Sequence, residues 1–190
     1  MSPKRIWLTL DDGPHPVHTE QILRVLDRHR IKATFFVIGE KVADQDAMVR
    51  RAFDAGHRIG NHSFTHRRMT ELSPPEIRDE IEKTDQLISR YTNGQKIFRP
   101  PFGAHDAKVD AIVDALGHRI VMWHVDPTDW DPRHQPKAWI GRALHEMGDK
   151  PDCVILNHDD RATTAAHYDL FIERIKRTGS VNFEHPDTLG

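Results

Sequence analysis

Short apolar runs alternate with longer amphipathic segments along the whole chain, and this alternation restricts the fold more than any other feature. Segments with helical periodicity separate runs at 6–10, 33–38, 57–60, 96–98, 119–125, 153–156 and, more weakly, 180–183. Strands that alternate with helices favour βαβ units and a parallel sheet. With about seven such units in a 190-residue chain, a closed or nearly closed α/β barrel is the economical architecture, and we expect one domain over residues 1–190.

The clearest helical segment begins with a capping box that has proline at the first helical position, Ser73-Pro74-Pro75-Glu76. Apolar residues then recur close to one helical face, at Ile77, Ile81, Ile88 and Tyr91. A second predicted helix carries Ile22, Leu23 and Leu26.

Charge and hydropathy exclude several classes of partner. The formal net charge is −2, with both signs mixed along the chain, so no basic stripe predicts nucleic-acid binding. No stretch approaches the roughly 18 apolar residues of a membrane span. The N-terminal residues do not resemble a signal peptide, so we expect a cytoplasmic protein or one whose leader has been removed. The single cysteine, Cys153, lies in an apolar run and is expected to be a buried core thiol.

Polar side chains follow several of the predicted strands. Asp11-Asp12 follow the first strand and His62 the third; Arg99 to Gly103 follow the fourth, Asp126 to Trp130 the fifth, and His158 the sixth. In parallel α/β folds the carboxyl ends of the strands form the functional face. Five separate segments are therefore expected to converge on one mouth.

Asp11, Asp12, His62 and His66 together suggest a metal centre. Two neutral imidazoles and one carboxylate can hold a divalent ion and leave a position for water. Both aspartates can reach one site only if the strand ends there, and Gly13-Pro14 supplies such a break. The two histidines are four residues apart and would share a face on a helical turn. Alone, the first motif could be a surface turn and the second a solvated helix face.

Two histidines and a carboxylate also describe the iron site of some oxygenases. That chemistry requires neither a second carboxylate beside the ligand, nor an arginine on another strand end, nor a further histidine opposite. A metal-assisted hydrolase uses all three: the spare aspartate as base, the arginine to orient it, and the distant histidine to protonate the leaving group.

Five motifs in order resemble the polysaccharide deacetylases with a NodB homology domain, carbohydrate esterase family 4. They are Thr9-Leu10-Asp11-Asp12-Gly13-Pro14, Gly60-Asn61-His62-Ser63-Phe64-Thr65-His66, Arg99-Pro100-Pro101-Phe102-Gly103, Asp126-Pro127-Thr128-Asp129-Trp130 and Leu156-Asn157-His158. The resemblance spans nearly the whole chain. It implies a distorted (β/α)7 barrel, similar to a TIM barrel, which agrees with the number of strands expected above.

The resemblance also implies roles for individual residues. Asp12, His62 and His66 would hold the metal, usually Zn²⁺, with Co²⁺ or another divalent transition metal as alternatives. Asp11 would be the general base, held by Arg99, and His158 the general acid, paired with Asp129. The backbone N–H of Phe102 would help to stabilise the oxyanion. Side chains that would wall the acetyl pocket are Phe102, Trp130 and Leu156, while Asp126 would shape its loop.

The expected reaction is hydrolysis of an N-acetyl group on an N-acetylglucosamine-containing glycan, such as a chitooligosaccharide or peptidoglycan, with release of acetate. Because loops are short and no leader is evident, soluble oligosaccharides are the first choice of substrate. An O-acetyl esterase acting on acetylated xylan is the alternative within the hydrolases. A non-catalytic metal-binding or glycan-binding domain is the alternative outside them, although such a domain has no need of a proton-transfer pair. The sequence does not indicate an oligomeric state.

Overall fold

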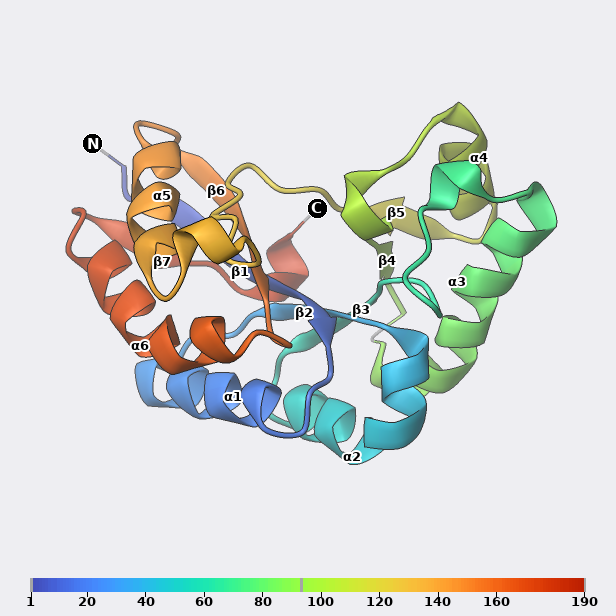
Figure 1. Ribbon diagram of the computed structural model, residues 1–190, viewed down its shortest axis with the longest axis horizontal. Coiled ribbons are helices and arrows are strands. Elements are labelled where there is room, and N and C mark those ends of the chain that lie inside the picture. The colour runs from blue at the N-terminus through green and yellow to red at the C-terminus, as the bar shows by residue number, and fades with distance from the viewer. Residues whose placement is uncertain (1, 93, 190) are drawn as a thin grey trace.

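The computed structural model describes residues 2–92 and 94–189 and has an α/β fold (Figure 1). Its strands are β1 (Lys4–Gly13), β2 (Thr34–Val37), β3 (Arg58–Asn61), β4 (Lys96–Phe98), β5 (His118–Ile120), β6 (Asp152–His158) and β7 (Val181–Phe183). Its α-helices are α1 (His18–His29), α2 (Gly39–Asp54), α3 (Pro74–Ile88), α4 (Ala107–Ala115), α5 (Ala138–Met147) and α6 (Ala162–Lys176). The alternation of strands and helices expected from the sequence is confirmed.

The strands form one parallel sheet in the order β5-β4-β3-β2-β1-β6. The long strand β1 pairs with three strands: Arg5 to Asp11 pair with β6, while Lys4 to Ile6 also pair with β7 and Thr9 to Gly13 with β2. Strands β5 and β6 do not pair directly, and only an isolated bridge between Val125 and Ile155 spans that side. This arrangement is a distorted, incompletely closed barrel, as expected.

The fifth strand is shorter than the sequence predicts. The apolar run suggested a strand over 119–125, but β5 ends at Ile120. The Val121 N–H donates to the Phe98 carbonyl of β4, whereas the N–H groups of His124 and Val125 donate to the Val154 carbonyl of β6. Residues 121–125 thus cross the gap between two strands, and they cannot form a ladder with either one.

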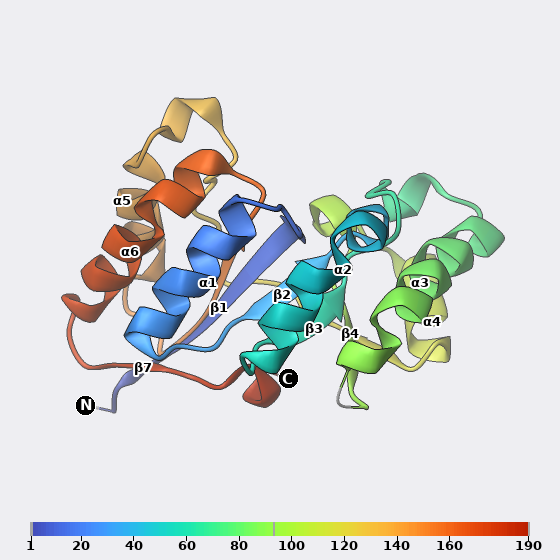
Figure 2. The same ribbon diagram turned by 90° about the horizontal axis from the view of Figure 1, so that it is seen from below.

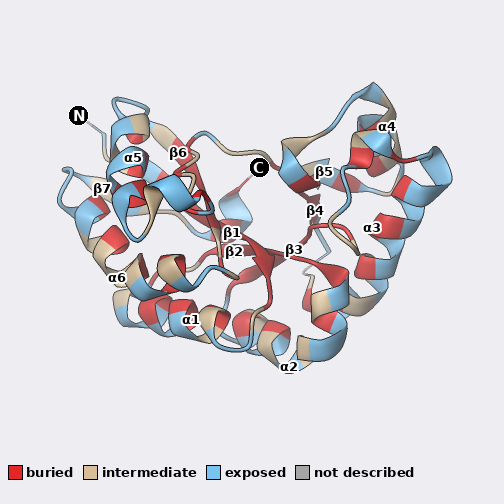
Figure 3. Ribbon diagram, in the orientation of Figure 1, coloured by how far each residue is buried: buried red, intermediate tan, exposed pale blue. Residues whose placement is uncertain are grey.

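The helices lie side by side around the outer face of the curved sheet, as Figure 2 shows. Successive residues of β1 point to opposite sides of the sheet. Ile6, Leu8 and Leu10 belong to the large core under the helices. Trp7 faces the barrel interior in a smaller cluster that also contains Phe36, Ile97, Val121, Val154 and Leu189. Burial is concentrated in the strands and in the helix faces that cover them (Figure 3).

Local sequence signals account for several of these elements. Helix α3 begins at Pro74 after the predicted capping box, where the Glu76 carboxylate accepts a hydrogen bond from the Ser73 N–H at 2.9 Å. The predicted apolar faces of α1 and α3 are buried. Cys153 is a free, buried thiol in the core, as expected. In residues 2–92 and 94–189, no helix has both the length and the hydrophobicity needed to cross a membrane.

Candidate active site

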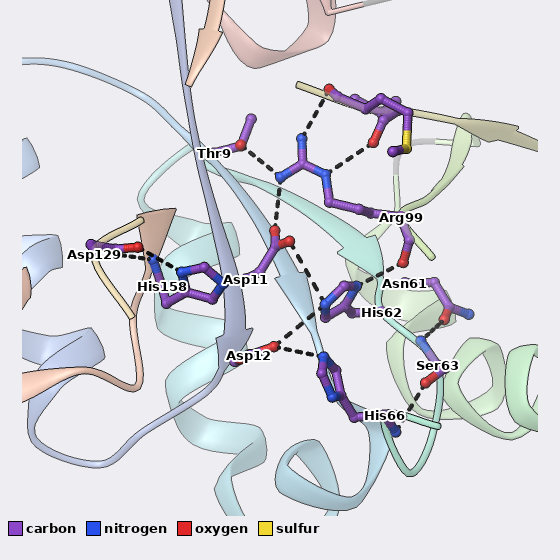
Figure 4. Close-up of polar contacts among 12 residues, drawn as sticks. Thr9, Asp11, Asp12, Asn61, His62, Ser63, His66, Arg99, Asp129 and His158 are labelled. Carbon is purple, nitrogen blue, oxygen red and sulfur yellow. Dashed lines mark hydrogen bonds and ion pairs between the residues drawn. The ribbon is translucent and has the colours of Figure 1, made fainter. Parts of the chain in front are cut away.

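A pocket of about 360 Å³ opens at the carboxyl ends of the strands. The ends of β1 and β6 contribute to its lining, together with the segments that follow β3, β4 and β5. The predicted site residues found there are Asp11, Asp12, His62, His66, Phe102, Trp130, Leu156 and His158. Arg99 and Asp129 lie directly behind them, fully buried and hydrogen-bonded to Asp11 and His158 respectively (Figure 4). The expected convergence of five segments is therefore confirmed.

The two adjacent aspartates reach one site because β1 is irregular at Asp12. The strand ends at Gly13, at the Gly13-Pro14 break that the sequence predicts, and its register with β2 shifts after Asp11. Asp12 adopts a left-handed backbone conformation with φ of 72°. The irregularity turns the Asp12 carboxylate into the pocket beside that of Asp11. Glycine is required next, because a Cβ at position 13 would lie 2.2 Å from Asp159 Oδ2.

Asp12, His62 and His66 bring three potential ligand atoms within 4.8 Å of one another. Asp12 Oδ1 lies 3.4 Å from His62 Nε2 and 3.1 Å from His66 Nε2. His62 Nδ1 is 2.7 Å from the Arg99 carbonyl oxygen, which can only accept, so Nδ1 carries the hydrogen. In the neutral imidazole, the Nε2 lone pair then faces Asp12. Carboxylate and imidazole lone pairs directed at one point suit a divalent cation, and Zn²⁺ takes such ligands.

The Asp12 carboxylate is also kept ionised. Burial alone would raise the pKa of Asp12, but the nearby imidazoles of His62, His66 and His158 outweigh it and hold this pKa well below its usual range. Asp12 Oδ1 has no well-formed hydrogen bond in the described part of the chain, although it is buried. A buried, ionised oxygen without such a bond fits a metal ligand.

The histidines converge through a loop and not through a helical turn. Residues 62–66 contain no helix, and both Ser63 and His66 have positive φ values, of 65° and 59°. The sequence-based expectation of a shared helical face was therefore wrong in its geometry. The HxxxH spacing still brings the two rings together, with centroids 5.0 Å apart, because the chain folds back on itself between them.

Arg99 holds Asp11 from inside the barrel. Its Nη1 donates to Asp11 Oδ1 at 2.8 Å and to Thr9 Oγ1 at 2.7 Å. Its remaining nitrogens donate to the carbonyls of Val121 and Met122. Burial lowers the pKa of Arg99 while the charge of Asp11 opposes the change, and a guanidinium stays protonated regardless. The arginine thus fixes the orientation of Asp11.

His158 stands opposite Asp11 in the register of β1 and β6 and is paired with a buried carboxylate. The ring Nδ1 of His158 lies 2.7 Å from Asp129 Oδ1, and the backbone N–H of His158 donates to Asp129 Oδ2 at 2.9 Å. Thr164 Oγ1 donates to the same Oδ2 at 2.7 Å. Burial by itself would lower the pKa of His158, but the charge and hydrogen bond of Asp129, with Asp12 and Asp11 further away, raise it to about 9. The imidazole is therefore suited to hold a proton at neutral pH.

Two large exposed aromatic side chains stand at the pocket, Phe102 at 59% and Trp130 at 46% relative exposure. Phe102 has a φ of 60° and packs edge-on against His66, with ring centroids 4.7 Å apart. Leu156 lines the pocket from β6. These residues form apolar walls around the polar centre.

Two further residues that the sequence motifs do not include line the pocket, Trp123 and Arg161. The Trp123 ring lies 5.5 Å from the Arg99 guanidinium. Arg161 pairs with Asp160 at 3.0 Å and also lies 3.9 Å from Asp12. Asp126 shapes its loop by accepting from the Thr128 N–H, as expected, and lines the pocket as well.

Residues 1–121 match the family model described as polysaccharide deacetylase. The peptidoglycan-N-acetylglucosamine deacetylase PgdA of Listeria monocytogenes is 36% identical over 177 residues, covering 93% of this chain. The chain spans only 37% of that relative's length. A chitooligosaccharide deacetylase of Bradyrhizobium is 36% identical over 159 residues, covering 82% of this chain and 71% of the relative.

A solved structure from Bacillus anthracis, described as a pseudoenzyme of carbohydrate esterase family 4, has the same fold. It matches with a TM-score of 0.87 and 32% identity, covering 100% of this chain and 66% of the other. Because this neighbour is a pseudoenzyme, similarity of fold does not establish activity. The argument for chemistry must come from the side chains of the pocket.

Proposed function

The chain belongs to the polysaccharide deacetylase family, and from this premise we propose that it is a metal-dependent N-deacetylase of N-acetylglucosamine-containing glycans. The observation that carries the proposal is the arrangement of the pocket. Three potential ligand atoms, from Asp12, His62 and His66, share one pocket with an arginine-held carboxylate and a carboxylate-held imidazole. A binding module would need neither of the two ion pairs.

Asp12, His62 and His66 would hold the metal, for which Zn²⁺ is the first choice and Co²⁺ an alternative. When bound, the metal supplies a Lewis acid that polarises the acetyl carbonyl and acidifies water. The remaining steps belong to side chains of this protein. Asp11, ionised and oriented by Arg99, takes a proton from the water that attacks the acetyl carbon.

The developing negative charge on the carbonyl oxygen needs donors that are already in place. The backbone N–H of Phe102, a residue that lines the pocket, would supply such a donor. His158 then gives its proton to the sugar nitrogen as the C–N bond breaks, so that the amine leaves neutral and acetate is released. Asp129 supports this step because it keeps the imidazole protonated and fixes its orientation.

The relatives suggest the class of substrate. One is named for peptidoglycan and one for chitooligosaccharides, and both glycans contain N-acetylglucosamine. The exposed rings of Phe102 and Trp130 offer apolar surfaces for a sugar and its acetyl methyl group. We therefore expect a glycan chain to lie across the pocket, with the acetyl group directed between these rings towards His158.

Acetate release with product mass, measured on chitooligosaccharides, peptidoglycan fragments and acetylxylan, tests the proposal. We expect activity on the first two that is lost with a chelator and restored by Zn²⁺ or Co²⁺. A clear preference for acetylxylan would establish an O-acetyl esterase instead. Binding of glycan without any acetate release, in the metal-loaded protein, would establish a non-catalytic domain.

A further inference from the structure

We propose that Glu80, a buried carboxylate on α3, is a positioning residue that shapes the loop of residues 62–66 and so sets the metal affinity of the site. This inference rests on the proposed function, because it concerns the loop that carries His62 and His66. It adds a residue from outside the five motifs. Glu80 lies in a helix that the sequence marks only as amphipathic.

The loop leaves backbone donors that no backbone acceptor satisfies. The N–H groups of Phe64 and Thr65 both donate to Glu80 Oε2, at 2.9 and 2.8 Å. The Thr65 hydroxyl donates to Glu80 Oε1 at 2.5 Å. One carboxylate therefore accepts three hydrogen bonds from two consecutive loop residues. This arrangement stabilises a backbone that is left-handed at Ser63 and again at His66.

Glu80 is buried, with 6% relative exposure, and no lysine, arginine or histidine lies within ion-pair distance of it in the part of the chain that the structure describes. A buried carboxylate without a cation is costly unless hydrogen bonds satisfy it. Here the loop supplies those bonds. The carboxylate and the loop thus depend on each other, and replacing the carboxylate leaves two peptide donors without an acceptor.

The same helix also supports the start of the loop. Asn61 Oδ1 accepts from the Ser63 N–H at 2.9 Å, and Asn61 Nδ2 donates to Asp85 Oδ1 of α3 at 2.8 Å. Ser63 Oγ in turn accepts from the His66 N–H at 3.0 Å (Figure 4). Helix α3 therefore supports the loop at two points. Asp85 contacts Asn61, just before the loop begins, and Glu80 contacts Phe64 and Thr65 in the middle of the loop.

The two histidines do not depend equally on this support. His62 follows β3 directly, is 3% exposed in its side chain, and is fixed by its contact with the Arg99 carbonyl. His66 is 24% exposed and is placed by the folded loop and by the edge contact with Phe102. Loss of the Glu80 contacts should therefore release His66 while His62 keeps its place, which leaves a weaker two-residue site.

The test compares Glu80→Ala and Glu80→Gln, with Glu82→Ala as a matched control from the exposed face of the same helix, where Glu82 pairs with Arg78. Zn²⁺ affinity is measured by competition with a chromophoric chelator, and the Co²⁺-loaded proteins are compared by visible absorption. Residues that orient metal ligands typically change affinity by 10–100-fold. We expect a loss of about that size in Glu80→Ala, with an altered Co²⁺ spectrum.

Glu80→Gln should stay within about threefold of wild type, because an amide can accept from both peptide donors and donate to the Thr65 hydroxyl. Glu82→Ala should match wild type. Wild-type Zn²⁺ affinity and Co²⁺ spectrum in Glu80→Ala would overturn the inference. If Glu80→Ala does not fold, Thr65→Val decides: it removes one of the contacts at a partly exposed position, and an unchanged affinity and spectrum would equally overturn it.

The outcome separates this inference from the proposed function. Wild-type protein that binds neither Zn²⁺ nor Co²⁺ contradicts the metal-dependent function itself. Wild-type protein that binds metal, with Glu80→Ala binding it equally well, contradicts only the role of Glu80. Thermal unfolding of the metal-free variants is recorded alongside, so that a general loss of stability is not mistaken for a loss of metal ligands.

Discussion

The two sides of the pocket use the same kind of ion pair in opposite senses. On one side the fully buried Arg99 holds the carboxylate of Asp11, and on the other the fully buried Asp129 holds the imidazole of His158. The first pair favours a group that lacks a proton, and the second favours a group that keeps one. The pocket is therefore polarised, with a candidate proton acceptor and a candidate proton donor beside the candidate metal ligands.

The two sides also differ in how the chain builds them. Asp11 and Arg99 come from β1 and from the end of β4, inside the barrel. His158 ends β6, but its partner Asp129 lies in the irregular segment between β5 and α5. Strands therefore position the Asp11 side of the pocket, whereas the His158 side also depends on the segment between β5 and α5 that carries Asp129. Four substitutions test whether the two sides are as different as this geometry indicates.

Asp11→Asn should have the largest effect. The amide cannot take a proton from water, so we expect kcat/KM for acetate release to fall by about 10²–10⁴-fold. Metal content, measured by elemental analysis, should stay near that of wild type because the three ligand residues are unchanged. Asp27→Asn, at an exposed position on α1, is the control and should be fully active. An active Asp11→Asn protein would refute the assignment of the base.

Arg99→Met should lower the stability of the protein as well as its activity, because it removes the partner of Asp11. Removing one partner of a buried ion pair costs about 3–5 kcal/mol because the remaining charge is left uncompensated. Urea unfolding of the metal-free protein measures this loss. Arg5→Met is a useful comparison, since Arg5 of β1 pairs with Asp152 of β6 at 2.6 Å and both side chains are exposed. Equal losses of unfolding free energy in the two variants would show that the buried pair stabilises the fold no more than the exposed pair does.

Asp129→Asn should change the His158 side through protonation. Without the carboxylate, the pKa of His158 should fall below its value of about 9. An imidazole is protonated below its pKa, so the basic limb of the activity profile should move to lower pH, with kcat reduced about 10–100-fold. NMR titration of the metal-free protein measures the pKa directly. Thr164→Val, which keeps the Asp129 charge, should leave it nearly unchanged.

The raised pKa of His158 also makes the stability of the protein depend on pH. The pKa of His158 is raised in the folded protein, so its contribution is fully present below pH 6.5 and is lost as the pH rises towards 9. Metal-free wild type should therefore lose stability over that range. The stability of metal-free Asp129→Asn should change less with pH over that range. Equal pH dependence of stability in the two proteins would contradict the pairing of His158 with Asp129.

Asp159→Asn should have the smallest effect, because Asp159 belongs to neither the Arg99–Asp11 pair nor the Asp129–His158 pair. Burial, together with the charges of Asp160 and Asp12, raises the pKa of Asp159 to about 7 although Thr19 Oγ1 donates to it at 2.5 Å. Between pH 4 and 7 the folded protein keeps a proton that the unfolded chain has lost, so stability falls as pH rises. At pH 8 the amide should raise Tm by about 2–4 °C, or ~1 kcal/mol. The gain should vanish near pH 4.

The sequence predicted much of the site because its residues stand at strand ends. Asp11, His62 and His158 follow apolar runs, and the carboxyl ends of parallel strands meet at one edge of a sheet. Backbone irregularities were not predictable in this way. The left-handed Asp12 and the folded loop between His62 and His66 depend on tertiary contacts, such as the close approach of Asp159 to Gly13.

Periodicity also could not separate residues 121–125 from a strand, since apolar residues that bridge two strands resemble those that pair with one. Trp123 and Arg161 were missed for a related reason. Each stands beside a recognised motif and has no spacing signal of its own. Glu80 was less accessible still, because a polar residue in an amphipathic helix is expected on the solvent side, and only the packed structure shows that it is buried.

The pairing of β1 has a consequence for biosynthesis. Asp11, Arg99 and both histidines are translated before β6 exists, yet Asp11 lies opposite His158 in the finished sheet. Until residues 152–158 leave the ribosome, β1 lacks that neighbour and presents an open strand edge. Contacts between such distant parts of a chain form late in folding. The candidate site is therefore complete only once the chain has been made past β6.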